Sequence, residues 1–133
     1  MIRQAWPKPA PRKRRHPVGF SDEVKAAVVW RSGGVCELDS CGRAVQIHHR
    51  APRGRGGARL DWVNAAANAL HVSLACHARI ESDRSVALEN GWLILRNGWR
   101  MASEVPVLRR GRLVLLDDDG HVCDLPYPVG GAG

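Results

Sequence analysis

The stretch from Val35 to Glu81 reads VCELDSCGRAVQIHHRAPRGRGGARLDWVNAAANALHVSLACHARIE, and the rest of the chain is organised around it. It contains three of the four cysteines and four of the six histidines of the 133-residue chain, together with a run of arginines. Thiolate and imidazole groups bind metal ions, and guanidinium groups bind phosphate. We therefore expect the functional site in this stretch.

The cysteines of the stretch have the spacing of a metal-binding loop. Cys36 and Cys41 are close enough in sequence to hold one ion from a single loop, and Cys76 would come from a second loop. A structural zinc takes four N or S ligands in a tetrahedron, and His71, five residues before Cys76, is the candidate for the fourth. The alternative is that Cys76 is a buried thiol. Cys123 is far away in sequence and is expected in the core.

The histidines point to a second type of chemistry. His48 and His49 lie at the end of a predicted strand over residues 44–48. Adjacent strand residues point to opposite faces, so both can serve one site only where the strand ends or bends. His77 lies early in the next predicted helix, with Glu81 at i+4 on the same face. One strand-end histidine and His77 could hold a divalent cation. The other strand-end histidine could then deprotonate water, a task that suits an imidazole.

Arginines surround the histidine pair, with no acidic residue among them. Guanidinium groups match phosphate in bidentate fashion, and glycines in the same loop let backbone N–H groups approach an anion. The alternative is a solvated loop. The arginines expected to contact a nucleic-acid backbone are Arg43, Arg50, Arg53, Arg55 and Arg59.

The net charge of +7 is concentrated at the start of the chain. Residues 1–20 hold six of the 20 basic residues and no acidic one, so the remainder has 14 basic and 13 acidic residues. Such an arm suits a polyphosphate partner, although a solvated tail would have the same composition. The sequence has no apolar run of about 18 residues and no secretory signal at its start. We therefore expect a cytoplasmic protein with no membrane partner, whose cysteines are thiols or metal ligands and not disulfides.

The remaining elements follow from caps, periodicity and turn residues. Ser21 is an expected N-cap of a helix that ends at Gly33-Gly34 and places Val24, Val28 and Trp30 on the core. The other expected elements are strands over 44–48 and 68–74, a helix over 76–90 ended by Gly91, a hairpin around Asn97-Gly98, a strand pair over 105–108 and 112–116, and a polar turn at 117–120 before 121–125.

One combination of residues has a specific order and spacing, namely Cys36-x4-Cys41, His48-His49, Pro52, Gly56-Gly57, Asn68 and Cys76-His77. It resembles the HNH endonucleases of the ββα-metal (His-Me finger) superfamily. The preceding helix and the Arg- and Gly-rich loop are most similar to the small HNH proteins of actinobacterial phages and prophages. The resemblance covers about residues 20–85.

The resemblance implies roles for these residues. His49 matches the general base that activates water, and Asn68 matches the residue that pins the loop and orients the base, which its spacing to His77 fits better than that of Asn64. Glu81 stands where some relatives carry a further histidine ligand. The implied catalytic residues are His49, Asn68 and His77, and the implied ligands of a catalytic divalent ion (Mg, Mn, Ni or Zn) are His48, His77 and Glu81.

The chain departs from the family at one position. Zinc-containing members have a second Cys-x2-Cys before the final histidine, and Ser73 stands where the first of that pair belongs. A neutral hydroxyl is a poor zinc ligand. Either His71 replaces it, so that Cys36, Cys41, His71 and Cys76 hold a structural zinc, or that zinc is weak or lost.

The expected architecture is a small α+β protein with a ββα-metal core, a zinc-knuckle-like loop, an N-terminal helix and C-terminal β-hairpins. Its expected organisation is a disordered basic arm (1–19), a nuclease core (20–90), a hairpin extension (91–126) and a frayed tail (127–133). The resemblance implies metal-dependent hydrolysis of double-stranded DNA in a bacterial host cytoplasm, for phage DNA packaging or processing. The alternatives are a non-catalytic zinc-stabilised nucleic-acid-binding module, or an accessory factor that recruits phage terminase or other packaging proteins.

Overall fold

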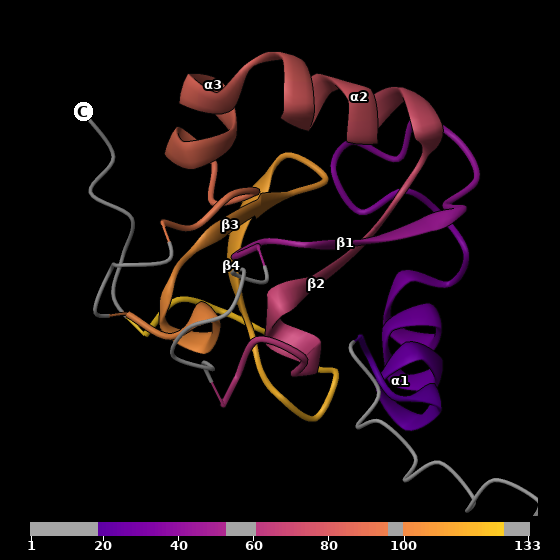
Figure 1. The fold of residues 1–133 in the computed structure, drawn as a ribbon, viewed down its shortest axis with the longest axis vertical. Coiled ribbons are helices and arrows are strands. Elements are labelled where there is room, and N and C mark those ends of the chain that lie inside the picture. Colours follow the sequence, from indigo (N-terminus) through magenta and orange to yellow (C-terminus); the bar gives the residue numbers. More distant parts are fainter. Residues whose placement is uncertain (1–18, 53–60, 96–99, 127–133) are drawn as a thin grey trace, which may run out of the picture.

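A computed structural model describes residues 19–52, 61–95 and 100–126 (Figure 1). The predicted α+β class is confirmed: the described residues form helices and two small antiparallel sheets. The elements are α1 (Asp22–Ser32), β1 (Gln46–His49), the 3-10 helix η1 (Ala66–Asn68), β2 (Ala69–Val72), α2 (Leu74–Ser82), α3 (Arg84–Glu89), the 3-10 helix η2 (Ala102–Glu104), β3 (Val107–Arg109), β4 (Arg112–Leu116) and β5 (Val122–Cys123). The predicted arm up to residue 18, Arg53, Arg55, Arg59, the Asn97-Gly98 turn and the tail lie outside the described residues.

Helix α1 begins and ends where its capping residues predict. The Ser21 hydroxyl accepts the N–H of Val24, and Gly33 closes the helix in the left-handed region at φ 65°. Val28 is fully buried, but Trp30 is 75% exposed, so its expected place in the core is wrong. The reason is helical geometry: two residues beyond Val28, a side chain points about 200° away around the helix axis.

Strands β1 and β2 form an antiparallel ribbon in which His48 pairs with Leu70 and His49 with Ala69. The side chains alternate across it. Gln46 and His48 point toward α2, while Ile47 and His49 point toward the small apolar cluster under α1. The ribbon therefore separates the two adjacent histidines onto two faces, with His49 at the very end of β1.

The helix expected over 76–90 is two helices. It begins at Leu74 because Ser73 is its N-cap, with the hydroxyl accepting the N–H of Cys76. It breaks at Asp83, which has non-helical backbone angles and whose side chain accepts the N–H of Val86 to start α3. Gly91 follows α3 at φ 74°, as expected for a residue that stops a helix.

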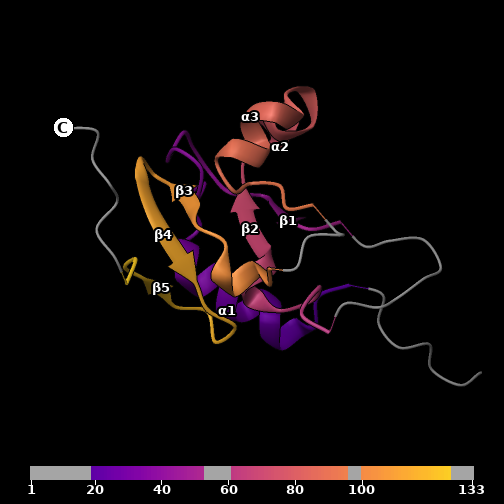
Figure 2. The same cartoon turned by 90° about the vertical axis from the view of Figure 1, so that its left-hand side faces the viewer.

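The C-terminal part forms a three-stranded sheet, β3-β4-β5, and Figure 2 shows it beside the β1-β2 ribbon, with α2 and α3 at one end and α1 at the other. The strand pair predicted over 105–108 and 112–116 is confirmed, with Arg110 and Gly111 at positive φ in the turn. Residues 92–95, however, do not form a strand. Their backbone instead contacts the end of β1, since Ile94 donates to the Arg50 carbonyl.

One apolar core joins the two parts of the chain. Leu70 and Ile80 from the ribbon and α2 pack in the same cluster as Trp92, Val107 and Leu116. A buried ion-pair group also spans them: Arg31 of α1 and Arg109 of β3 both bind the carboxylate of Glu37, which is 0% exposed. The segment beyond residue 90 therefore helps to fix the ribbon and α2 in place.

We expect Gly91→Ala to destabilise the protein by more than about 1 kcal/mol, since a substitution whose backbone angles are incompatible costs more than the usual glycine effect. A β-carbon at this position would lie 2.0 Å from the Pro106 carbonyl oxygen, which cannot move without shifting β3. Urea denaturation would measure the loss. Gly33→Ala is the matched control, because Gly33 has a similar φ but open space around it. An equal loss in both variants would contradict the close-contact explanation.

Candidate functional site

The ribbon and α2 bring two predicted site residues together. The imidazole rings of His48, near the end of β1, and His77, in the first turns of α2, have centroids 5.4 Å apart. Glu81 lies one turn further along α2, with Oε1 3.5 Å from His77 Nε2. Within the described ranges, His48, His77 and Glu81 do not bring three ligand atoms within 4.8 Å of one another. The two histidines therefore form the central pair, and the exposed Glu81 is peripheral.

Hydrogen bonds fix the orientation of both rings. His48 Nε2 lies 3.0 Å from the Trp92 carbonyl oxygen, and His77 Nδ1 lies 2.5 Å from Gln46 Oε1. Because these oxygens only accept, His48 carries its proton on Nε2 and His77 on Nδ1. The remaining nitrogen of each ring keeps its lone pair, as in a histidine that binds a metal while donating its other N–H to an oxygen.

The electrostatics of this pair suit a cation. Burial lowers the pKa of His48 to about 4, so its imidazole is neutral at pH 7 and can donate a lone pair. His77 Nε2 lies 3.5 Å from Glu81 Oε1, so the carboxylate is close enough to interact with a cation held by this ring. The donor set, two imidazoles with a nearby carboxylate, fits a divalent transition metal better than calcium.

His49 has a different environment. Its ring stacks on Phe20, with centroids 3.9 Å apart, and its Nε2 lies 3.0 Å from Asn64 Oδ1. The contact with Asn64 puts the ring proton on Nε2, so Nδ1 is the basic nitrogen. The residue that orients His49 is thus Asn64, which precedes η1, whereas the family pattern gives this role to Asn68.

Asn68 has the other role that the resemblance implies, which is to pin the loop. It is fully buried, its Oδ1 accepts the N–H of Ala51, and its Nδ2 donates to the carbonyls of Ala51 and Val63. These bonds close the two ends of the loop that follows His49. The two roles fall to two asparagines, because Asn64 contacts the His49 ring whereas the Asn68 side chain binds the backbone of Ala51 and Val63.

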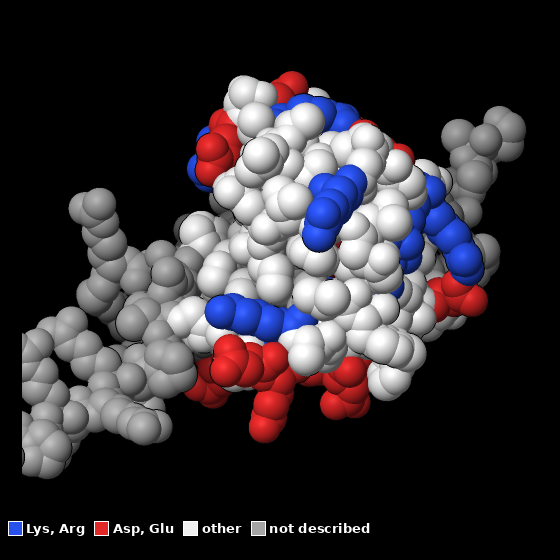
Figure 3. Space-filling view, turned by 90° about the vertical axis from the view of Figure 1, so that its right-hand side faces the viewer, with Lys and Arg blue, Asp and Glu red and all other residues white. Residues whose placement is uncertain are grey.

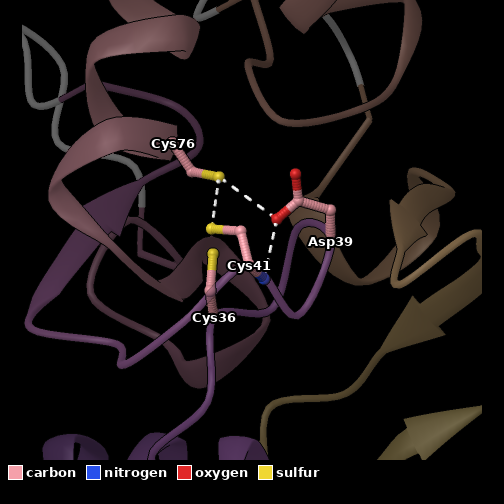
Figure 4. Close-up of side chains that lie close together, drawn as sticks. All are labelled: Cys36, Asp39, Cys41 and Cys76. Atoms are coloured by element: carbon pink, nitrogen blue, oxygen red, sulfur yellow. Dashed lines mark hydrogen bonds between the residues drawn. The ribbon is translucent and has the colours of Figure 1, made fainter.

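Three thiols and a carboxylate form a second cluster (Figure 4). One ligand atom from each of Cys36, Asp39, Cys41 and Cys76 lies within 4.8 Å of the other three. Cys41 Sγ is 3.2 Å from Cys76 Sγ, and Asp39 Oδ1 accepts both the Cys41 backbone N–H and the Cys76 thiol. The three cysteines expected at one metal site are therefore brought together. Cys123 is half-buried on β5, with Sγ 3.8 Å from Asp117.

The structure does not bring His71 to this cluster, which corrects its predicted role as the fourth ligand. The His71 side chain is buried under α1, where Nδ1 lies 2.7 Å from the Ser32 hydroxyl. The expectation assumed that His71 and Ser73 share one face of a strand. Strand β2 ends at Val72, however, and Ser73 already belongs to the turn into α2, so the alternation stops between them.

The thiols differ in their ease of ionisation. Burial raises the pKa of Cys76 to about 12. Burial opposes ionisation of Cys36 as well, but backbone hydrogen bonds from Ser73 and Leu38 lower its pKa overall. A thiol in an apolar setting with a raised pKa ionises readily only next to a cation. A metal ion would supply that cation.

Arg50 is not a nucleic-acid-binding residue, because its side chain is 0% exposed. Its guanidinium donates to four backbone carbonyls, those of Ala67, Gly91, Ala102 and Val105. Burial lowers the pKa of Arg50 to about 9. Arg50 is instead a structural residue that ties the end of β1 to the segment following α3, whose Trp92 carbonyl orients His48.

Arg43 is exposed and retains its predicted place on the surface. Figure 3 shows that on the face to the right of Figure 1 the described basic side chains lie apart from one another, with acidic side chains along the lower edge and in smaller groups at the upper left and at the right. This face of the described residues therefore presents separate cations and no continuous basic patch.

The acidic turn before β5 is a polar turn, as expected. Asp117, Asp119 and His121 lie close together, and the Asp117 carboxylate accepts the backbone N–H groups of Asp119 and His121. Because the carboxylate closes the turn in this way, its position needs no ion.

Two residues of these sites were missed by sequence reasoning. Asp39 lies between Cys36 and Cys41 in the sequence. Carboxylate oxygens also bind zinc, so this position was a signal that could have identified Asp39 as a candidate ligand. The spacing of Asn64 to His77 fits the family pattern less well than that of Asn68, and only the fold shows that Asn64 reaches His49.

No protein-family model, curated protein or solved structure matches this chain. None of the described helices is long and apolar enough to cross a membrane. Function is therefore inferred from the geometry of the two clusters.

Proposed function

We propose that this protein is a metal-dependent HNH-type endonuclease that hydrolyses phosphodiester bonds of double-stranded DNA. The observation that carries the proposal is the pairing of His48 and His77, 5.4 Å apart, on an antiparallel ribbon followed directly by a helix. Each ring donates one N–H to an oxygen and keeps a lone pair on its other nitrogen. A half-buried, oriented pair of imidazoles, each with a lone pair on one nitrogen, is suited to holding a divalent cation.

In this proposal His48 and His77 hold the catalytic divalent ion, one of Mg, Mn, Ni or Zn, with Glu81 as an outer carboxylate. The bound ion would polarise the scissile phosphate and stabilise the leaving 3′ oxygen. The protein's own contribution is orientation: the Trp92 carbonyl and Gln46 hold the two rings, and the Arg50 side chain holds the segment that carries Trp92.

His49 is the proposed general base. Asn64 holds its ring with the proton on Nε2, which makes Nδ1 the nitrogen that takes a proton from the attacking water. Phe20 stacks on the ring and limits its rotation. Asn68 acts indirectly, by closing the loop that follows His49.

DNA affinity is proposed to come from exposed Arg43, from Arg53, Arg55 and Arg59, and from the basic residues at the start of the chain. Such contacts are independent of sequence and weaken as salt concentration rises. A role in phage DNA packaging or processing, with packaging proteins as partners, is the proposed setting. It rests on the resemblance stated above.

The thiol cluster is the proposed site of a structural zinc. Cys36, Cys41 and Cys76 come from the loop after α1 and from the first turn of α2, so an ion there would fasten the loop to the helix that carries His77. Zinc binding to such a site contributes directly to folding.

Incubation with supercoiled plasmid tests the proposed activity. The purified full chain is supplied with Mg, Mn, Ni or Zn ions in turn, and EDTA serves as the control. Metal-dependent nicking or linearisation is expected. Zinc-dependent folding and DNA retention without any cutting would instead favour a zinc-stabilised binding module. Capture of a nuclease by a non-cutting protein would favour an accessory factor.

A matched pair of variants tests the roles of the two asparagines. Asn64→Ala should lower the cutting rate about 10–100-fold, the usual cost of losing the partner that orients a functional imidazole, with little change in melting. Asn68→Ala should instead destabilise the fold by about 1–3 kcal/mol, because it leaves the buried backbone groups of Ala51 and the half-buried carbonyl of Val63 without their hydrogen-bond partner. Cutting rates and thermal melting of both variants check this. The reverse pattern would return the orienting role to Asn68.

A further inference from the structure

The proposed structural zinc has three cysteine ligands within reach, and a tetrahedral site needs a fourth. Three side chains near the cluster are candidates: Asp39, Ser73 and His71. The environments of the three side chains distinguish them.

The side chains of His71 and Ser73 both form other hydrogen bonds. The His71 ring points under α1 to the Ser32 hydroxyl. The His71 backbone N–H donates to the Glu37 carboxylate, and the His71 carbonyl accepts the Glu37 N–H. Ser73 Oγ lies 3.0 Å from Cys41 Sγ, but it is the N-cap of α2 and accepts the Cys76 N–H. A neutral hydroxyl in this role is also a poor zinc ligand beside thiolates.

Asp39 has the position and the chemistry of a ligand. Its Oδ1 lies 3.3 Å from Cys76 Sγ and is anchored by the Cys41 backbone N–H at 3.1 Å. In a tetrahedron with Zn–S bonds near 2.3 Å, the ligand atoms lie about 3.5–3.8 Å apart. The atoms of the cluster, from 3.2 Å to at most 4.8 Å apart, would need to move by only about 1 Å or less to reach this geometry.

The second oxygen of Asp39 is held by a cation. Arg79 of α2 donates from Nη1 to Asp39 Oδ2 at 2.9 Å, and its guanidinium lies 5.5 Å from the ring centroid of Trp92. A ligating carboxylate usually has its other oxygen hydrogen-bonded in this way. Arg110, which donates to the Cys36 carbonyl, brings a second positive charge near the loop. Three thiolates and a carboxylate around Zn²⁺ would carry a net charge of −2, and these two arginines would offset it.

We propose that Asp39 is the fourth ligand, so that this chain has a Cys3Asp zinc site in which Arg79 positions the carboxylate. The inference rests on the proposed structural zinc and is independent of whether the protein cuts DNA. In the family pattern a cysteine ligand stands at the position of Ser73. Asp39 would supply the fourth ligand in its place. Because Asp39 and Cys41 are exposed, this edge of the site is open to solvent.

Zinc binding by the full chain tests the proposal. Zinc affinity is measured by competition with a chromophoric chelator for the wild type, Asp39→Ala, Asp39→Cys and Ser73→Ala. Loss of a ligand should cost more than the 10–100-fold that losing an outer-shell partner costs, so Asp39→Ala should lower zinc affinity by more than about 100-fold. Asp39→Cys should retain or tighten zinc. Ser73→Ala removes a helix cap and a hydroxyl contact to Cys41 Sγ but no ligand, so its effect should stay within the 10–100-fold of an outer-shell partner and below that of Asp39→Ala.

X-ray absorption of the zinc-loaded wild type gives a readout that does not depend on variant folding. Three Zn–S distances near 2.3 Å and one Zn–O distance of about 2.0 Å are expected, with four sulfur distances in Asp39→Cys. The proposal is overturned if Asp39→Ala binds zinc as tightly as the wild type, or if Asp39→Cys still shows three sulfurs. A wild type that binds no zinc would overturn the structural zinc and this inference together. Plasmid cutting is scored separately, so loss of nuclease activity alone would leave both intact.

Discussion

Replacing His49 by alanine is expected to lower DNA cutting by about 10²–10⁴-fold, the usual contribution of a general base, while leaving DNA affinity nearly unchanged. The reason is that a base takes its proton in the transition state and contributes little to binding of the substrate. Single-turnover cutting of plasmid and fluorescence anisotropy with labelled duplex DNA measure the two quantities.

Loss of packing is the main competing explanation for an inactive His49→Ala protein, because the ring stacks on Phe20. Phe20→Leu is the matched control, since it removes the stacked ring and leaves the imidazole and Asn64 in place. We expect Phe20→Leu to retain far more activity than His49→Ala at equal fractions of folded protein. Cutting by His49→Ala at the wild-type rate would refute the assignment of the base.

The largest effect on stability is expected for Glu37→Gln, at about 3–5 kcal/mol, the usual cost of removing one partner from a buried ion pair. The Glu37 carboxylate binds Arg31 through both oxygens, Arg109 through Oε2 and the His71 N–H through Oε1. Burial alone would raise the pKa of Glu37. Hydrogen bonds and the charge of Arg31, together with a hydrogen bond from Arg109, lower this pKa overall. A neutral amide of the same shape leaves the buried guanidinium of Arg31 and the half-buried guanidinium of Arg109 without a counter-charge.

Urea denaturation monitored by tryptophan fluorescence measures this loss. Glu104→Gln is the control, because Glu104 is exposed and its neutralisation removes the same charge from the chain. Zinc content is determined in parallel, since Glu37 follows Cys36 directly in the sequence. A loss below about 1 kcal/mol, the range of exposed ion pairs, would show that the buried group contributes little.

Local signals predicted the elements that carry the site. Ser21 and Gly33 act within one helical turn, so the bounds of α1 could be read from the sequence. The ribbon followed by α2 was also expected. The approach of His48 to His77 follows from it, because β1 pairs with β2 and α2 comes directly after β2.

Residues whose role depends on distant partners could not be assigned in this way. Arg50 belongs to the same arginine run as Arg53, and only the fold shows that Arg50 is enclosed by carbonyls from 17 to 55 residues away. Glu37 likewise gave no signal, since its partner Arg109 lies 72 residues away.

The metal cluster illustrates the limit of spacing arguments. Cys36, Cys41 and Cys76 could be grouped from their positions, but the choice of His71 depended on an alternation that ends one residue before Ser73. Asp39 reaches the thiols because the loop turns back at Ser40, which has a positive φ of 58°. Such a turn brings a carboxylate to its neighbours in a way that no periodic pattern predicts.

Manganese-dependent cutting of supercoiled plasmid by three proteins tests the central claim most directly. These are the wild type, His77→Ala and His121→Ala, the last removing an exposed histidine that contacts Asp117 in the turn before β5. The proposed function predicts nicking by the wild type and by His121→Ala, no nicking by His77→Ala, and none by any of them in EDTA. No cutting by the wild type with any metal, or equal cutting by all three proteins, would contradict it.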